Sequence, residues 1–260
     1  MFYHKLEIEK GRLRRLTKLQ SIHDDPERDI LKIAVLAIPG EENRRVRENF
    51  HHIPFDDADL LFLSGNRDMI TLQPIFQRNG WQHWIQSRPG IGQDLMVIAS
   101  RSPFGTSGET AARQQDNGVK IYLPGHDMRI SGIDFPKSRD TRDSELLFRK
   151  ILKIFELQKD NPAVIMGNLK IPAANLDTIL DYKHYLQEIA SLGWSNAWRT
   201  LHPMTYERIW YGSMGQPIHL NLVFLSPLLR ESLIAAYHCQ PFSDNRQTAK
   251  DFRILLVELA

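Results

Sequence analysis

The chain has 260 residues, of which 42% are hydrophobic and 25% are charged, a composition typical of a soluble globular protein with a sizeable core. Its 33 basic and 31 acidic residues nearly balance, so the overall charge does not argue for a nucleic-acid-binding protein. A single cysteine excludes an intrachain disulfide, no apolar stretch is long enough to span a bilayer, and the N-terminus lacks the apolar run of a signal peptide. We therefore expect a cytoplasmic protein, with a secreted effector as the alternative.

Residues 1–29 are expected to form a basic N-terminal extension. Within residues 5–18, lysines and arginines are spaced among leucines and isoleucines. Such basic runs usually face water, and the alternative is an arm for an anionic partner. From residue 30 onward no linker divides the chain, so we expect one domain over residues 30–260.

Apolar runs that end at Gly, Pro or Ser predict β-strands in the first half of this domain. The first run, Leu31–Ile38, is stopped by Pro39 and Gly40. Residues 105–118 are rich in Gly, Thr, Gln and Asp and predict a loop. Further strands are expected at residues 58–63, 94–100, 119–123 and 128–135.

The second half of the domain mixes helices with strands. A helix is expected from Ser144, because apolar residues there recur on one stripe, and a second amphipathic helix at residues 176–191. Strands are expected at residues 163–168, 219–225, 233–239 and 252–259. The order predicts a layered α/β fold, with a mixed, largely antiparallel sheet system flanked by helices.

The ends of several strands carry a resemblance to a known family. One strand ends in Gly167-Asn168-Leu169-Lys170, another in Ser-Arg-Ser-Pro at residues 100–103, and residues 194–203 read Trp-Ser-Asn-Ala-Trp-Arg-Thr-Leu-His-Pro. In order and spacing these endings resemble the endonuclease/exonuclease/phosphatase superfamily, which includes apurinic endonucleases and deoxyribonuclease I. The resemblance extends from residue 30 to the C-terminus and implies a sandwich of two sheets flanked by helices.

The resemblance also implies a chemistry, the hydrolysis of phosphate esters with a divalent cation, usually Mg²⁺, held by carboxylates. Carried over position by position, most of the family's site residues are missing in this sequence. The family's metal-binding Glu and Asn correspond to Gly65 and Ala37, the Asp and Asn of its Gly-Asp-Phe-Asn ending to Asn168 and Lys170, the Asp of its Arg-Ile-Asp-Tyr strand to Asn221, and its two histidines to Asp134 and Phe252. Asp251 alone keeps the family identity, and a second placement of that ending, at residues 243–246, also lacks the histidine.

These substitutions predict a pseudoenzyme that binds a protein partner or a phosphate-bearing ligand and needs no cofactor. The alternative is a divergent phosphodiesterase or nuclease whose site is rebuilt around Asp134 and Asp251, with His202 or His219, and which uses Mg²⁺. A third hypothesis keeps only nucleic-acid binding, through Arg44, Arg45 and Arg47. Arginines on a polar loop more often serve solubility, which makes this the weakest of the three.

The remaining chemically active residues are better explained by structure than by function. Cys239 lies in an apolar strand and is expected to be a buried, unreactive thiol. The histidines His51, His52 and His83 lack the spacing of a metal site. Core packing is expected for the five tryptophans, Trp81, Trp84, Trp194, Trp198 and Trp210, with base stacking as the alternative.

Overall fold

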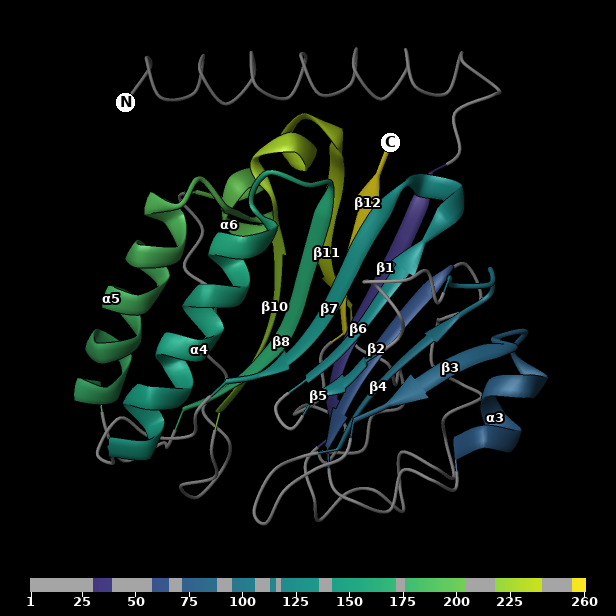
Figure 1. Ribbon diagram of the computed structural model, residues 1–260, viewed down its shortest axis with the longest axis horizontal. Coiled ribbons are helices and arrows are strands. Elements are labelled where there is room, and N and C mark those ends of the chain that lie inside the picture. The colour runs from purple at the N-terminus through teal and green to yellow at the C-terminus, as the bar shows by residue number, and fades with distance from the viewer. Residues whose placement is uncertain are drawn as a thin grey trace.

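The computed structural model describes residues 30–38, 58–65, 72–87, 95–105, 113–115, 118–135, 142–171, 176–203, 218–239 and 254–260. These residues form two six-stranded β-sheets with helices against them (Figure 1). The α/β sandwich of two mixed, largely antiparallel sheets is therefore confirmed. The predicted basic extension at residues 1–29 lies outside the described residues.

The first sheet has the strand order β11-β12-β1-β2-β4-β3. In it β1 and β2 pair in parallel, and the other neighbours pair antiparallel. Because β12 lies between β11 and β1, the last strand of the chain occupies an inner position next to the first. The strands are β1 (Leu31–Ile38), β2 (Leu60–Gly65), β3 (His83–Gln86), β4 (Leu95–Ser100), β11 (Leu233–Cys239) and β12 (Ile254–Leu259).

The second sheet has the strand order β5-β6-β7-β8-β10-β9. The parallel neighbours β7 and β8 are joined by a helix, as parallel strands require a crossover connection. The other neighbours pair antiparallel. The strands are β5 (Arg113–Gln115), β6 (Gly118–Leu123), β7 (Met128–Asp134), β8 (Ala163–Ile171), β9 (Ser195–Asn196) and β10 (Ile218–Leu225).

The prediction of a loop over residues 105–118 is wrong in part. Arg113–Gln115 forms β5 and pairs antiparallel with β6, which begins at Gly118. Gly105 also forms an isolated bridge with Tyr122. The polar side chains of β5 give no strand pattern, so its strand state depends on backbone hydrogen bonds to the neighbouring strand.

Two long helices cover the outer face of the second sheet, α4 (Arg142–Gln158) and α5 (Leu176–Ser191) (Figure 1). Under them the ring of Phe155 packs edge-on against Trp194, with ring centroids 4.9 Å apart, and against Phe224 at 5.3 Å. These aromatic contacts, each with buried partners, provide the apolar surface that holds the helices on the sheet.

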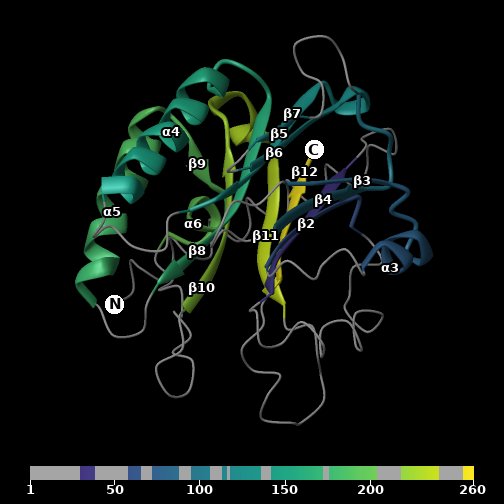
Figure 2. The same ribbon diagram turned by 60° about the horizontal axis from the view of Figure 1, so that its bottom comes forward.

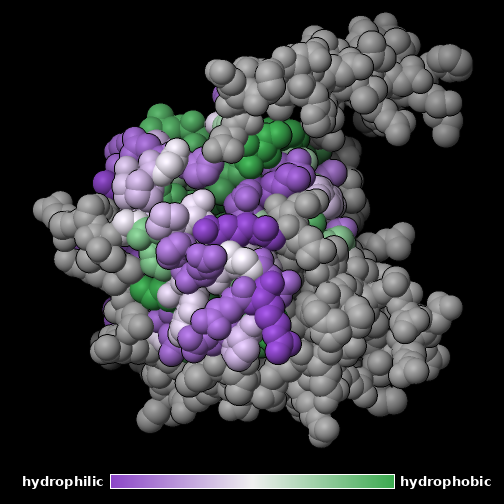
Figure 3. Space-filling view, turned by 90° about the vertical axis from the view of Figure 1, so that its right-hand side faces the viewer, coloured by the Kyte–Doolittle hydropathy of each residue, from purple (hydrophilic) through white to green (hydrophobic). Residues whose placement is uncertain are grey.

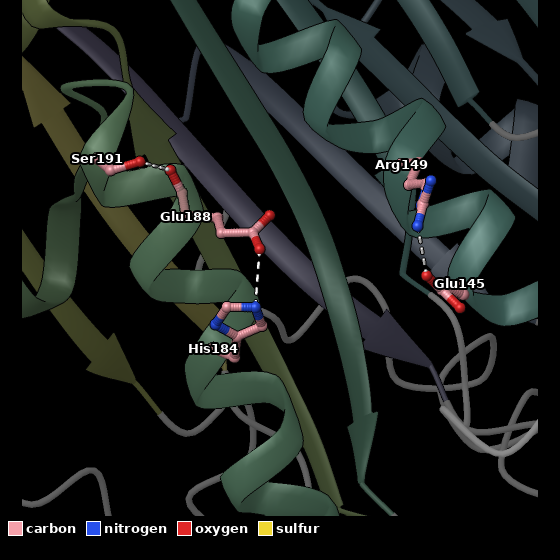
Figure 4. A network of polar contacts seen from close by, with 5 residues as sticks. All are labelled: Glu145, Arg149, His184, Glu188 and Ser191. Atoms are coloured by element: carbon pink, nitrogen blue, oxygen red, sulfur yellow. Dashed lines mark hydrogen bonds and ion pairs between the residues drawn. The ribbon is translucent and has the colours of Figure 1, made fainter.

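The solvent side of these helices carries an ion pair and a histidine–glutamate contact, each between residues one helical turn apart. Arg149 contacts Glu145 at 2.8 Å on α4, and His184 contacts Glu188 at 2.8 Å on α5 (Figure 4). Ser191 also donates a hydrogen bond to the backbone oxygen of Glu188, at 2.7 Å. Because these side chains are largely exposed, the pairs contribute little to stability.

The long helices lie on one side of the sandwich and a short helix lies on the other. Figure 2 shows α4 and α5 on one side and α3 (Gln73–Arg78) on the other. On the α3 and β3 side much of the described surface is hydrophilic, so this edge is adapted to water (Figure 3). The helix α6 (Ala197–Leu201) contacts β10 of the second sheet and β11 of the first, and so bridges them.

Of the helices described, none is long and apolar enough to cross a membrane.

The two sheets approach each other closely where β2 meets β7. A Cβ atom built on Gly132 would lie 2.3 Å from Cε2 of Phe62, so only a glycine leaves room for the ring. Phe62 belongs to the apolar cluster between the sheets, as do Val164 and Met166 of β8. The intervening residue of β8, Ile165, belongs to the cluster under the helices. This alternation identifies which residues of each strand face the other sheet.

Candidate functional site

A row of three buried polar residues crosses the second sheet. Asp134 is the last residue of β7, its register partner on β8 is Asn168, and Asn168 pairs in turn with Asn221 on β10. Their exposed fractions are 8%, 1% and 7%. Asn168 continues the alternation of Val164 and Met166, so the row faces the first sheet. Three positions inferred separately from the sequence are therefore brought together.

The two asparagines of this row bond to each other. Nδ2 of Asn168 donates a hydrogen bond to Oδ1 of Asn221 at 3.3 Å. Both amides are neutral at every ordinary pH, so they lie side by side without repulsion. Neither can accept a proton as a general base, and neither supplies negative charge to a cation.

At this end of the sandwich β1 and β2 present small side chains to the second sheet, beside Met96 on β4. Ala37 on β1 and Ser64 on β2 are register partners and are 6% and 2% exposed. Ser64 continues the inward-facing series of Leu60 and Phe62. Among the described residues, the hydroxyl of Ser64 has no hydrogen-bond partner. Sequence reasoning missed Ser64, because an unbroken apolar run does not show which of its residues face inward.

Both halves of the site lie toward the same end of the sandwich. Phe62 and Gly132 are in close contact between the sheets. On β2, Ser64 is the next inward-facing residue after Phe62, and on β7, Asp134 is the next after Gly132. In Figure 1 both strands run toward the lower edge of the molecule. The polar row and the Ala37–Ser64 pair thus occupy the region beyond the closest approach of the sheets.

Gly65, the position matched to a metal-binding Glu, follows Ser64 at the end of β2. A Cβ atom built there would lie 2.6 Å from the backbone oxygen of Ile38 and 3.1 Å from its Cβ. Ile38 belongs to the cluster on the outer face of the first sheet, together with Leu61 and Leu63. Position 65 is therefore directed away from the face that carries Ala37 and Ser64.

For the other residues of the predicted site except His202, the structure describes at most the backbone. Lys170, two residues after Asn168 on β8, is the register partner of His219, two residues before Asn221 on β10, and the placement of their side chains is not described. Asp251 and Phe252 lie outside the described residues, as do Arg44, Arg45, Arg47, His51 and His52.

His202 lies away from the polar row, in contact with β11 of the first sheet. Nε2 of its ring lies 2.8 Å from the backbone oxygen of Ala236 on β11, and its ring packs on Trp198 with centroids 3.9 Å apart. This contact lies next to α6, where Asn196 pairs with Phe224 near the end of β10, whereas Asn221 lies nearer its start. His202 therefore anchors α6 to the edge of the first sheet.

The Mg²⁺ site that the resemblance implies does not fit the described residues. Mg²⁺ prefers octahedral oxygen ligands and is usually held by carboxylates. The row supplies one carboxylate, from Asp134, next to two amides that bond each other. Within the ranges described, no three His, Cys, Asp or Glu side chains gather in a way that could hold a metal ion.

The tryptophans in the described structure serve packing, as expected. Trp81 and Trp194 are buried, and their ring nitrogens donate to the backbone oxygens of Ala58 at 3.2 Å and Phe155 at 3.1 Å. The other two described ones, Trp84 and Trp198, pack against the core clusters. Trp210 lies outside the described residues.

Cys239 and His83 also have the environments of structural residues. Cys239, at the end of β11, is partly buried, and this burial raises the pKa of its thiol. A raised pKa lowers the fraction of thiolate at neutral pH, which is the reactive form. The ring of His83 packs edge-on against Phe104, with centroids 6.2 Å apart.

No protein-family model matches the chain, and no curated protein is similar to it. Solved structures are similar, among them the 3′ phosphatase NExo from Neisseria bound to product DNA hairpin, with a TM-score of 0.66 and 16% identity over 88% of this chain and 99% of that one. The chain has the fold of the endonuclease/exonuclease/phosphatase superfamily. An AP endonuclease from Archaeoglobus fulgidus follows, at a TM-score of 0.60 and 17% identity over 88% and 99% of the two chains. A protein from Beutenbergia cavernae described as endonuclease/exonuclease/phosphatase has a TM-score of 0.55 and 14% identity over 89% and 72%.

Proposed function

We propose that this protein is a pseudoenzyme of the endonuclease/exonuclease/phosphatase fold, which binds a partner and does not hydrolyse phosphate esters. The observation that carries the proposal is the hydrogen bond between the amides of Asn168 and Asn221, at the centre of the buried polar row. Metal-assisted hydrolysis needs negative ligands for the cation and a group that takes a proton. In the described row, Asp134 is the one side chain with either property.

The shortage of cation ligands among the described residues also bears on how phosphate would bind. A phosphate ester carries negative charge, and buried next to the Asp134 carboxylate it would be repelled unless a cation intervened. A ligand bound by neutral amides alone gains hydrogen bonds without the polarisation that lowers the barrier to hydrolysis. These residues therefore favour binding over catalysis.

The direct test is hydrolysis under conditions that favour an active enzyme. Purified protein is incubated with single-stranded DNA, duplex DNA with an abasic site, and a simple aryl phosphodiester, each with Mg²⁺ or Mn²⁺. We expect product to form no faster than in a blank without protein. Hydrolysis that EDTA abolishes would contradict the proposal, and calorimetric titration with Mg²⁺ should show no binding heat.

The alternative is a divergent hydrolase whose site is rebuilt around Asp134, with Mg²⁺ as cofactor. The observation in its favour is the burial of Asp134 beside two hydrogen-bonding side chains. The variant Asp134→Asn distinguishes the two hypotheses, because it has nearly the same shape and no charge. Loss of a measurable wild-type rate in this variant would establish the rebuilt site, whereas equal blank rates support the pseudoenzyme.

The partner of the pseudoenzyme is proposed to be another protein or a phosphate-bearing ligand, in the reducing cytoplasm that a single cysteine suits. DNA is the first ligand to test, because the Neisseria structure with this fold contains a product DNA hairpin. A gel shift at increasing salt is the measurement. A shift that weakens steeply with salt would support nucleic acid, and no shift at low salt would favour a protein partner.

A further inference from the structure

The end of β2 has a geometry that accepts no side chain at position 65. A Cβ atom there would lie 2.6 Å from the backbone oxygen of Ile38 on the parallel neighbour β1, a separation that real Cβ atoms do not show. The obstacle is backbone and not the flexible tip of a side chain. Any residue larger than glycine therefore has to displace the end of β1 or of β2.

The direction of position 65 is a second obstacle to a metal ligand there. Gly65 alternates with Ser64, which continues the inward series of Leu60 and Phe62. The built Cβ points at Ile38, which is buried in the outer cluster of the first sheet. A side chain at position 65 would thus leave the face that looks toward Asp134.

We propose, as an inference that rests on the proposed function, that position 65 of the first sheet has lost the place for a metal ligand as well as the ligand itself. The backbone of β1 holds position 65 as glycine, and the inward positions beside it carry the methyl group of Ala37 and the hydroxyl of Ser64. The two halves of the site differ in this respect. Asn168 and Asn221 can be replaced by carboxylates of the same shape, whereas a carboxylate at position 65 is directed away from the face that carries Asp134.

The first experiment measures the thermal unfolding midpoint of Gly65→Ala, with Gly125→Ala as the matched control. A Cβ atom on Gly125 meets nothing within 4 Å, and its backbone needs no positive φ. We expect Gly65→Ala to lower the midpoint by about 3 °C or more and Gly125→Ala to leave it unchanged. If Gly65→Ala does not fold while Gly125→Ala does, the result also supports the proposal. Equal midpoints for the two variants would overturn it.

The second experiment measures Mn²⁺ binding by calorimetry in two variants that differ only at position 65. The double variant Asn168→Asp, Asn221→Asp provides three carboxylates with Asp134, and Gly65→Glu is then added to it. A ligand that reached the cation would tighten binding about tenfold or more. We expect no tightening, with a lower unfolding midpoint or loss of folding. Tighter binding at an unchanged midpoint would overturn the proposal.

These outcomes are separate from the test of the proposed function. Hydrolysis by the wild-type protein overturns the pseudoenzyme hypothesis whatever the variants at position 65 do. A tolerated side chain at position 65, in a protein that hydrolyses nothing, overturns the inference about β2 alone.

Discussion

The ring of Phe62 occupies the space that a side chain on Gly132 would need, with Cε2 2.3 Å from the position of a Cβ atom. Phe62 comes from the first sheet and Gly132 from the second, so this pair sets how closely the sheets approach at the base of the candidate site. The same Cβ would also lie 3.0 Å from a methyl group of Val119.

We predict that Gly132→Ala lowers the free energy of unfolding by about 1 to 3 kcal/mol, because it overpacks the contact between the sheets. Urea denaturation measures the change, and Gly125→Ala is the control with open space around its Cβ. Combining Gly132→Ala with Phe62→Leu should cost less than the sum of the two single changes, since the smaller side chain makes room. If the effects of the two single changes simply add in the double variant, Phe62 does not determine the cost of a side chain at position 132.

The amide pair of Asn168 and Asn221 predicts a change in pH dependence when both become carboxylates. Two buried carboxylates in this register repel, so the pKa of one rises above its ordinary value in the folded protein. A raised folded-state pKa means that stability is highest below the ordinary pKa and falls as pH rises through the raised one. The double variant should therefore be less stable at about pH 8 than at about pH 5, and Mn²⁺ should restore stability at the higher pH.

Asn221→Asp alone is the matched control for that experiment. Asn168 still donates to an acceptor at the same place, so the hydrogen bond is kept and becomes charge-assisted. The single variant should depend on pH less than the double one over the same range. A double variant with the pH profile of the wild-type protein would show that the two positions do not interact.

His202 is predicted to act on stability through α6. His202→Ala removes the contact with the backbone oxygen of Ala236 and the ring contact with Trp198, so the free energy of unfolding should fall by about 1 to 2 kcal/mol. The control is His184→Ala, which removes a mostly exposed histidine of α5 and should change stability little. Equal effects of the two changes would contradict the anchoring role of His202.

Cys239 is predicted to react slowly with thiol reagents in the native protein. Burial raises the pKa of its thiol, so less thiolate is present at neutral pH than in the unfolded chain. The rate of modification by a disulfide reagent should rise when urea is added and as pH increases through the raised pKa. Because the folded state holds this proton more tightly, Cys239 contributes stability at neutral pH that is lost at alkaline pH. A native rate equal to the unfolded rate would exclude this environment.

The sequence predicts the long elements of this fold well and the short ones poorly. The helix expected at residues 176–191 is α5, and the strand expected at residues 233–239 is β11. The strand β3 (His83–Gln86) and the helix α3 (Gln73–Arg78) give no such signal, because each is short and mixes polar with apolar residues. Their structure depends on neighbours that are distant in sequence, as β3 does on β4.

The sequence predicts only part of the candidate site. Strand endings locate Asp134, Asn168 and Asn221, but their row depends on strand register, and spacing along the chain does not determine register. The inward direction of Ser64 and the outward direction of Gly65 depend on which members of an apolar run face the other sheet. In a strand with both faces buried, hydrophobicity does not reveal this.

The position of β12 constrains how the protein is made. Its residues 254–259 fill a gap between β11 and β1, whose residues are separated by most of the chain. During synthesis β1 cannot pair with β12 until residue 259 has left the ribosome. Until then, one side of the β1 backbone lacks its partner strand. The first sheet is therefore completed only after translation of this strand.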